Sequence, residues 1–226
     1  MATDTRKKAA GKSKSGQKTE TKPSQKNHVL VMWSGGLDSN YRLAWLLKET
    51  DYMIHAHHMI VQNHENRAAA ELQMIEKLLP QYRDIRPFTY SQNIVDCNHL
   101  HYIPEDIVLM VYHAALLANS HARHSQLRPF THWTTGTNAD EGHDWSRWNY
   151  LQGIFSGAVF DRTTVPIKQP KFDLFHMVGK KSQCEYMKKI GLPEHWGCRK
   201  PVAQKNGAYT ICGQCRTCVE YKEIGC

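Results

Sequence analysis

Apolar and polar positions along the chain alternate between short strand-like runs and longer stretches with helical spacing. Residues 29–33 form a short apolar run that predicts a buried strand, and residues 40–48 are compatible with a helix. A second apolar run at residues 52–61 predicts another strand. Apolar residues then recur at helical spacing over residues 65–79, and a shorter strand is expected at residues 85–90.

The second half of the chain continues the same pattern. Pro104 and the carboxylates after it predict the start of a long helix. Strands are expected at residues 132–135 and 164–167, and a last helix at residues 173–190. The alternation predicts an α/β fold with a doubly wound, mainly parallel sheet of five strands. In such a sheet, ligands bind beyond the carboxyl ends of the strands.

A glycine-containing turn stands between the first strand and the first helix. It reads Ser34-Gly-Gly-Leu-Asp-Ser39. Gly35 and Gly36 allow the backbone to approach an anion closely, and the start of a helix directs N–H groups at phosphate. Ser34 and Ser39 can donate hydrogen bonds to phosphate oxygens. Asp38 would repel a bare phosphate, so its presence indicates a divalent cation such as Mg²⁺ between the carboxylate and the phosphate.

This turn lacks the longer glycine spacing and the Lys-Ser/Thr ending of a Walker A loop. It resembles the PP-loop of ATP pyrophosphatases, which cleave ATP between the α and β phosphates, and the alternative is an ordinary tight turn with incidental serines. The resemblance implies the fold of the adenine nucleotide alpha hydrolases, and ATP held by the turn and the residues around it. The predicted nucleotide-binding residues are Trp33, Ser34, Gly35, Gly36, Leu37, Asp38, Ser39, Asn40, Tyr41, Arg42 and Leu43, with Gly136 and Asn138 after a later strand.

Four of the seven cysteines cluster near the C-terminus. Cys198 is followed by Cys212, Cys215 and Cys218, with the spacing C-x13-C-x2-C-x2-C. Two overlapping Cys-x2-Cys turns and one distant thiolate predict a closed tetrahedral zinc site. An iron–sulfur cluster is the main alternative. Of the remaining cysteines, Cys184 is expected to be a small buried apolar side chain.

The first 27 residues differ in composition from the rest. They contain eight basic residues against two acidic ones, so they carry most of the formal net charge of +8. This segment is predicted to be a disordered basic tail with at most weak contact to a polyanion. No secretory signal and no apolar run long enough to span a bilayer is present, which predicts a cytoplasmic protein without a membrane partner. The expected division is a tail at 1–27, an ATP-binding domain at 28–195, and a cysteine region at 196–226.

Beyond the PP-loop, the chain resembles the QueC family, the 7-cyano-7-deazaguanine synthases, over nearly all of residues 28–221. Four blocks occur in the order of that family. They are the loop at residues 33–43, the turn at 136–140, the Pro-Ile-Lys-Gln-Pro-Lys segment at 166–171, and Trp196-Gly-Cys198 followed by Cys212-Gly-Gln-Cys-Arg-Thr-Cys218. The last block is the most specific.

The resemblance implies an ATP-dependent ligase. In this family 7-carboxy-7-deazaguanine is adenylated, ammonia displaces AMP to form an amide, and a second adenylation dehydrates the amide to the nitrile. Asp38 would hold Mg²⁺, Ser34 would contact phosphate, and Lys171 would supply a mobile positive charge, with Lys168 as the less favoured candidate. The family also implies a homodimer.

The chain departs from the family around the expected substrate. Asp106 stands where the family carries an arginine, and residues 140–149 replace the family's substrate loop. Asp140 is expected to match the first aspartate of that loop, and Arg147 is a candidate clamp for the substrate carboxylate. Trp145 and Trp148 could stack on a flat base or pack as core, and Arg67 is a further substrate-binding candidate.

These departures leave other functions open. The reaction could stop at the amide, or the enzyme could adenylate another acid. A different PP-loop chemistry, adenylation of a tRNA base followed by sulfur insertion, would need a reactive cysteine, for which Cys97 is a loose candidate. A third possibility is a protein that binds a nucleotide or a partner without catalysis.

Overall fold

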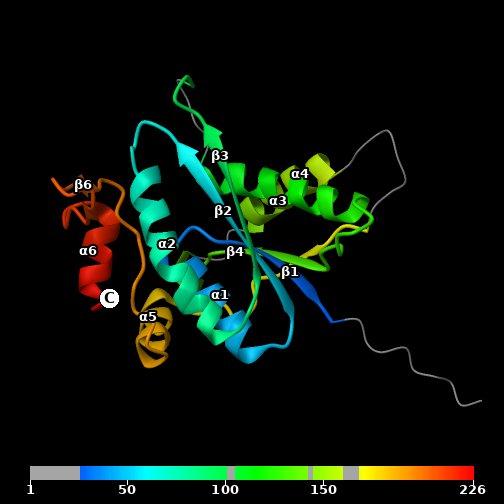
Figure 1. Cartoon of the computed structure of the whole chain (residues 1–226), viewed down its shortest axis with the longest axis horizontal. Helices are drawn as coiled ribbons and strands as arrows, with labels where there is room; N and C mark the ends of the chain where they lie inside the picture. The colour runs from blue at the N-terminus through cyan, green and yellow to red at the C-terminus, as the bar shows by residue number, and fades with distance from the viewer. Residues whose placement is uncertain (1–25, 101–104, 142–144, 160–167) are drawn as a thin grey trace, which may run out of the picture.

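The computed structural model describes residues 26–100, 105–141, 145–159 and 168–226. Within these ranges a five-stranded sheet has the order β3-β2-β1-β4-β5, and every neighbouring pair is parallel. Helices cover both of its faces (Figure 1). The predicted doubly wound α/β fold is therefore confirmed. The strands are β1 (His28–Met32), β2 (Met53–Gln62), β3 (Thr89–Asp96), β4 (His132–Thr135) and β5 (Lys171–Phe172).

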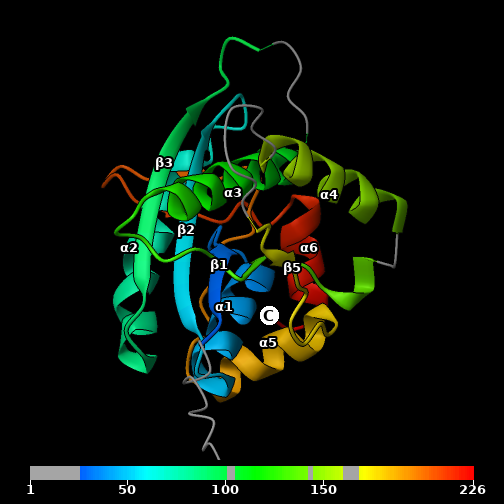
Figure 2. The same ribbon diagram turned by 90° about the vertical axis from the view of Figure 1, so that its right-hand side faces the viewer.

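The helices divide between the two faces of the sheet, with α3 and α4 on one side and α1, α2 and α5 on the other (Figures 1 and 2). They are α1 (Leu37–Glu49), α2 (Ala68–Ile85), α3 (Asp106–Arg123), α4 (Trp145–Val159), α5 (Lys180–Lys189) and α6 (Arg216–Glu223). A short 3₁₀ helix, η1 (Ala139–Glu141), follows β4, and β6 (Val202–Ala203) pairs with β7 (Tyr209–Thr210) as an antiparallel hairpin.

Strand β1 is apolar on both sides because it lies in the middle of the sheet. Val29 and Val31 belong to the core under α1, α2 and α5. Leu30 and Met32 belong to the core under α3 and α4. This arrangement explains why the sequence shows a continuous apolar run here instead of strand-like alternation.

Several element boundaries differ from the sequence-based expectation. The strand predicted at residues 85–90 is present but lies further along the chain, because α2 continues through Pro80 to Ile85 and β3 begins only at Thr89. Tyr82, which is fully buried, anchors this extension by donating a hydrogen bond to the carbonyl of Asn40, 3.1 Å away. The helix predicted at residues 173–190 begins at Lys180, and it is not the last helix, because α6 follows it. The strand expected at residues 164–167 lies outside the described residues, as does Pro104.

Cys184 is buried on α5, as expected, but it is not a free thiol. It forms a disulfide with Cys226, 42 residues further along the chain. The bridge connects α5 to the segment that follows α6. Most of the predicted basic tail lies outside the described residues, and of its last two members Lys26 pairs with Asp51.

Candidate functional site

A cavity of about 820 Å³ opens at the carboxyl ends of β1, β2 and β4, where the fold predicts a ligand site. The predicted nucleotide-binding turn forms one part of its wall through Ser34, Gly36 and Asp38. Other parts come from the loop after β4, the starts of α2, α3 and α5, and the C-terminal segment. The residues that line these other parts of the cavity include Asn63, Glu65, Arg67, Glu71, Glu105, Asp106, Gly136, Thr137, Arg147, Trp148, Lys180, Trp196, Gly197, Arg199, Thr217 and Tyr221.

The turn between β1 and α1 is fixed by its own hydroxyls. Ser39 Oγ accepts a hydrogen bond from the backbone N–H of Ser34 at 3.2 Å and donates one to the carbonyl of Gly36 at 3.1 Å. Gly35 has a φ of +78°, a backbone conformation that glycine adopts readily. Gly36 precedes α1 in an extended conformation. The backbone N–H groups at the start of α1, which have no carbonyl partner within the helix, therefore lie at the cavity, as an anion site requires.

The remaining predicted members of the turn support it from behind. The buried indole of Trp33 donates to Asn40 Oδ1 at 2.7 Å, and Asn40 Nδ2 donates to the carbonyl of Glu194 at 3.0 Å. Tyr41, Arg42, Leu37 and Leu43 are also buried and do not line the cavity. Arg42 Nη2 donates to the carbonyl of Thr137 at 3.3 Å, and its burial lowers the pKa of the guanidinium to about 10.

The loop after β4 closes against the turn. Asn138 is buried, and its Nδ2 donates to Asp38 Oδ1 at 3.1 Å. Gly136 passes so close to α1 that a Cβ there would lie 2.6 Å from the backbone nitrogen of Ser39. Gly136 and Asn138 therefore lie directly beside the Ser34–Ser39 turn.

The structure does not bring Lys171 to the cavity. Lys171 lies on β5 opposite His132, the first residue of β4, and so stands at the amino end of the sheet with its side chain exposed. Lys168 precedes it and is also exposed. Lys171 therefore lies at the opposite end of the strands from the Ser34–Ser39 turn, and neither lysine lines the cavity. This placement corrects the expectation that one of them faces the phosphates.

Lys180 is the lysine that lines the cavity. It is the first residue of α5, and its Nζ pairs with Glu220 Oε1 at 2.8 Å, with 16% of the side chain exposed. The signal that could have found it is the Gly179-Lys180 step, since Gly179 is the residue before the helix. Asp140, predicted to bind substrate, accepts the backbone N–H of Lys180 at 2.7 Å and so caps α5.

The other substrate candidates lie on or near α3 and α4. Arg147 lines the cavity and pairs with Glu105 at 2.7 Å. Trp148 also lines it, while its ring stacks on Phe172 with centroids 5.2 Å apart. Trp145 begins α4. The segment from residue 145 to 149, which replaces the family's substrate loop in sequence, is thus helical.

Arg67 lines the cavity within a cluster of charged side chains. Its guanidinium contacts Glu65 at 2.9 Å and Glu71 at 3.4 Å, and Nη2 also pairs with Asp106. Arg199 lies 3.5 Å from both Glu65 and Asp106. Burial is the main cause that raises the pKa of Glu71 to about 7. Three carboxylates therefore hold Arg67, so an incoming anion would compete with them.

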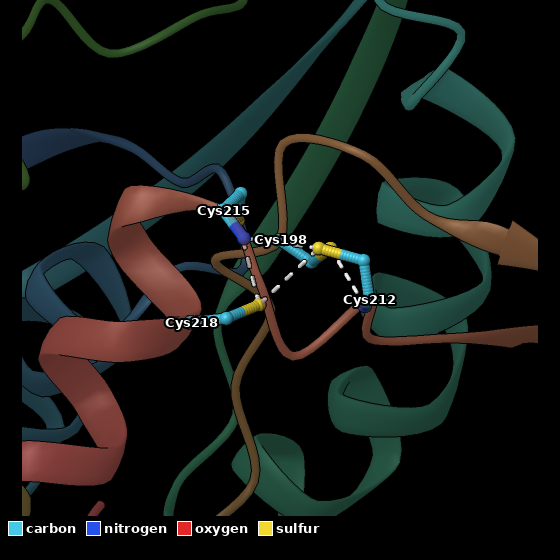
Figure 3. A group of neighbouring side chains, drawn as sticks. All are labelled: Cys198, Cys212, Cys215 and Cys218. Carbon is cyan, nitrogen blue, oxygen red and sulfur yellow. Dashed lines mark hydrogen bonds between the residues drawn. The ribbon is translucent and has the colours of Figure 1, made fainter.

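The four C-terminal cysteines converge, as predicted (Figure 3). Their sulfurs all lie within 4.8 Å of one another, with Cys212 Sγ 4.0 Å and Cys215 Sγ 3.4 Å from Cys218 Sγ. The backbone N–H of Cys212 donates to Cys198 Sγ at 3.2 Å, and such donors stabilise thiolates. Tetrahedral zinc with Zn–S bonds of about 2.3 Å would hold sulfurs about 3.8 Å apart. The cluster can therefore bind a metal, and its spacing fits a single ion.

The cysteine cluster is attached directly to the Ser34–Ser39 turn. The backbone N–H of Trp196 donates to the carbonyl of Gly35 at 2.8 Å, two residues before Cys198. Trp196, Cys198 and Cys218 pack together with Ala70 of α2. Whatever fixes the cysteines also fixes one side of the turn.

Comparison with known proteins gives a fold-level likeness only. No protein-family model and no curated protein matches the chain. Among solved structures, the U34-tRNA thiolase NcsA from Methanococcus maripaludis with its [4Fe-4S] cluster is similar over 88% of this chain, at 16% identity and a TM-score of 0.44. The match spans 64% of that thiolase's length.

A predicted subunit of a tRNA methyltransferase from Methanocaldococcus jannaschii is similar over 73% of this chain and 88% of its own, at 14% identity and a TM-score of 0.33. At these values neither structure identifies the reaction. Among the helices of the described ranges, none has both the length and the apolarity needed to cross a bilayer.

Proposed function

We propose that this chain is a PP-loop enzyme that uses ATP to adenylate a carboxylic acid, with 7-carboxy-7-deazaguanine as the substrate that its sequence resemblance favours. One observation carries the proposal. The Ser34–Ser39 turn presents the start of α1 to an 820 Å³ cavity that also contains Asp38 and Lys180. This combination supplies N–H donors, a cation and a carboxylate around one anion site.

The proposed reaction proceeds through an acyl adenylate and an amide. A carboxylate oxygen attacks the α-phosphorus of ATP, and pyrophosphate leaves. Ammonia attacks the acyl carbon, AMP leaves, and the nitrogen loses a proton to give the amide. The amide oxygen then attacks the α-phosphorus of a second ATP, and pyrophosphate leaves. The nitrogen loses its two protons as AMP leaves with the former amide oxygen, which gives the nitrile.

The chain's own residues act mainly by alignment and charge neutralisation. The N–H groups at the start of α1 and the Lys180 ammonium stabilise charge on the phosphates, which brings two anions together. Asp38, held by Asn138, is the residue that would bind Mg²⁺, which supplies further charge neutralisation when bound. The four C-terminal cysteines would hold a structural Zn²⁺.

The charged cluster supports recognition of an acid that also carries N–H donors. An acid group would find Arg147 or Arg67 only by competing with Glu105, or with Glu65, Glu71 and Asp106. Those same carboxylates are suitable acceptors for the N–H edge of a purine-like base. An enzyme that stops at the amide, or one that activates a different acid, remains the alternative within this proposal.

Sulfur insertion into a tRNA base receives less support. Cys97, the cysteine considered for that role, is 2% exposed and packs with Met59, Val61, Val95, Leu109 and Met110. It does not line the cavity. A sulfur carrier must reach both its donor and the activated base, and this burial disfavours such access.

The test is an AMP-release assay with the purified full chain. The protein is incubated with ATP, Mg²⁺, ammonium and 7-carboxy-7-deazaguanine, and products are followed by mass spectrometry. AMP with amide or nitrile is expected. No AMP with this acid or any other acid, or AMP formed only with tRNA, would overturn the proposal. Asp38→Asn should reduce AMP release by at least about a hundredfold. Asp51→Asn, at an exposed ion pair with Lys26, is the matched control and should leave the rate unchanged.

A further inference from the structure

Helix α6, which follows the cysteine cluster, forms a wall of the cavity. Thr217 and Tyr221 lie one turn apart on α6, and both line the cavity. Between them, Glu220 pairs with Lys180 of α5. The same face of α6 thus meets the nucleotide-binding turn and the lysine proposed to contact phosphate.

Tyr221 reaches the start of α1. Its hydroxyl lies near the backbone N–H of Leu37, the first residue of that helix, and within the electrostatic influence of Asp38. Burial raises the pKa of Tyr221, with the Leu37 amide acting in the opposite direction. The phenol therefore keeps its proton at neutral pH and retains an O–H group that can donate to an anion.

The ring of Tyr221 is held in place on two sides. It lies against Gly197, where a Cβ would overlap the ring. It also packs edge-on against His195, with centroids 4.6 Å apart. A side chain fixed in this way loses little conformational entropy when its hydroxyl binds a ligand.

The indole N–H of Trp196 is a second hydrogen-bond donor in the wall of the cavity. Trp196 is 7% exposed and lines the cavity, and its indole N–H has no hydrogen-bond partner among the described residues. Its backbone carbonyl passes within 3.4 Å of the position a Cβ would take at Gly36. A buried N–H without an acceptor costs free energy, which a ligand oxygen could recover.

We propose that Tyr221 is a phosphate-binding residue, whose hydroxyl donates a hydrogen bond to a phosphate oxygen of the nucleotide held at the start of α1. This inference rests on the proposed ATP site. It gives the cysteine-bound segment a direct part in nucleotide binding, because α6 begins immediately after Cys215. A phosphate oxygen near the Leu37 N–H would lie within reach of the Tyr221 hydroxyl, which lies near this amide.

The test measures binding of three probes to the full chain by calorimetry: MgATP, magnesium pyrophosphate and adenosine. Tyr221→Phe keeps the ring and removes only the hydroxyl. It should weaken MgATP and pyrophosphate binding by about tenfold and leave adenosine binding unchanged, since a hydrogen bond to a charged group is lost. Tyr186→Phe is the matched control. It removes a hydroxyl that donates to Glu49 at 3.2 Å and should change none of the three affinities.

The outcomes separate this inference from the proposed function. Wild-type protein that binds neither MgATP nor pyrophosphate would overturn both. Wild-type binding that Tyr221→Phe leaves unchanged, or strengthens, would overturn the Tyr221 inference alone. A loss that extends equally to adenosine would indicate a general structural role for the hydroxyl and would also overturn it.

Discussion

Lys180 and Lys171 have the same side chain but very different surroundings. Lys180 lines the cavity and is paired with Glu220, whereas Lys171 is exposed at the amino end of the sheet. A positive charge stabilises a phosphoryl transition state only where it approaches the phosphates. We expect Lys180→Met to lower kcat/KM for ATP by about a hundredfold in the AMP-release assay. Lys171→Met should stay within about twofold of wild type; the reverse ranking would contradict the placement of the phosphates.

Glu71 gives a prediction about stability and pH. Its folded-state pKa of about 7 exceeds its ordinary value of 4.5, mainly because of burial. The protonated form is therefore favoured in the folded protein. The stability that this preference contributes is complete below pH 4.5 and is lost as pH rises through about 7. The shift corresponds to about 3 kcal/mol.

Glu71→Gln tests this argument because it fixes the neutral form without changing the side chain's shape. The free energy of unfolding, from urea titrations, should change with pH by about 3 kcal/mol less in the variant than in wild type between pH 4.5 and pH 8. Equal pH dependence in the two proteins would show that Glu71 titrates normally. The neighbouring charges of Arg67, Asp106, Arg199 and Glu65 remain in both.

At the residue scale, the sequence motif predicted the position of the Ser34–Ser39 turn at the cavity, but it did not predict which lysine lies there. The residues from Ser34 to Ser39 are contiguous, so one turn carries them to the cavity together. A lysine that reaches the same place from a later element depends on where that element begins. The segment at 166–171 contains the two lysines that were expected to contact phosphate. The helix that brings a lysine to the cavity, however, starts at Lys180.

Strand β2 carries three buried histidines and predicts sensitivity to acid. His55 and His57 both contact Ser91 Oγ at 2.7 Å, and His58 Nδ1 donates to the carbonyl of Trp33 at 3.0 Å. Burial lowers the pKa of His55 to about 3 and that of His58 to about 4. The unfolded chain takes up protons near pH 6.5, whereas these folded side chains do so only well below it. The stability they contribute is present above pH 6.5 and is lost as pH falls.

The free energy of unfolding should therefore fall by about 5 kcal/mol between pH 7 and pH 4.5 from His55 and His58 together. Urea titrations at the two pH values measure it. His55→Gln, which can still hydrogen-bond Ser91, should remove about half of this loss. An undiminished loss in the variant would mean that other groups cause the acid sensitivity.

Elements with a strong local pattern were predictable, and elements set by tertiary contacts were not. The strand His132–Thr135 was predicted with its observed bounds, because an aromatic residue and two β-branched residues precede a polar turn there. The extension of α2 past Pro80 could not be predicted, since it depends on Tyr82 reaching Asn40 across the core. Helix α4 was not predicted, because its first residues belong to the segment that corresponds to the family's substrate loop.

Several connections between distant segments join the C-terminal region to the rest of the molecule. They include the disulfide between Cys184 and Cys226 and the hydrogen bond from Trp196 to Gly35. The cysteine spacing predicted the metal-binding cluster but not its position beside the turn. That position depends on how residues 191–198 cross the ends of α1 and α2, which no local pattern encodes.

This position predicts that metal removal affects the nucleotide site as well as stability. The four thiolates hold α6 and the Trp196 segment, which contact the turn through Gly35 and Leu37. Without an ion, the thiolates repel one another and the segment loses its fixed geometry. We expect one Zn²⁺ per chain by elemental analysis. Chelation should lower Tm by about 10 °C or more and weaken MgATP binding, with recovery on adding Zn²⁺.

Cys212→Ser should reproduce the chelated state, because it removes one of the four ligands. Cys97→Ala removes a thiol packed against Val95 and Leu109, outside the cluster, and should retain the metal and the affinity for MgATP. Visible absorption and bound iron in place of zinc would identify an iron–sulfur cluster instead. A metal-free protein with unchanged Tm and unchanged MgATP affinity would contradict the coupling itself, because the turn would then keep its shape without the thiolates being held.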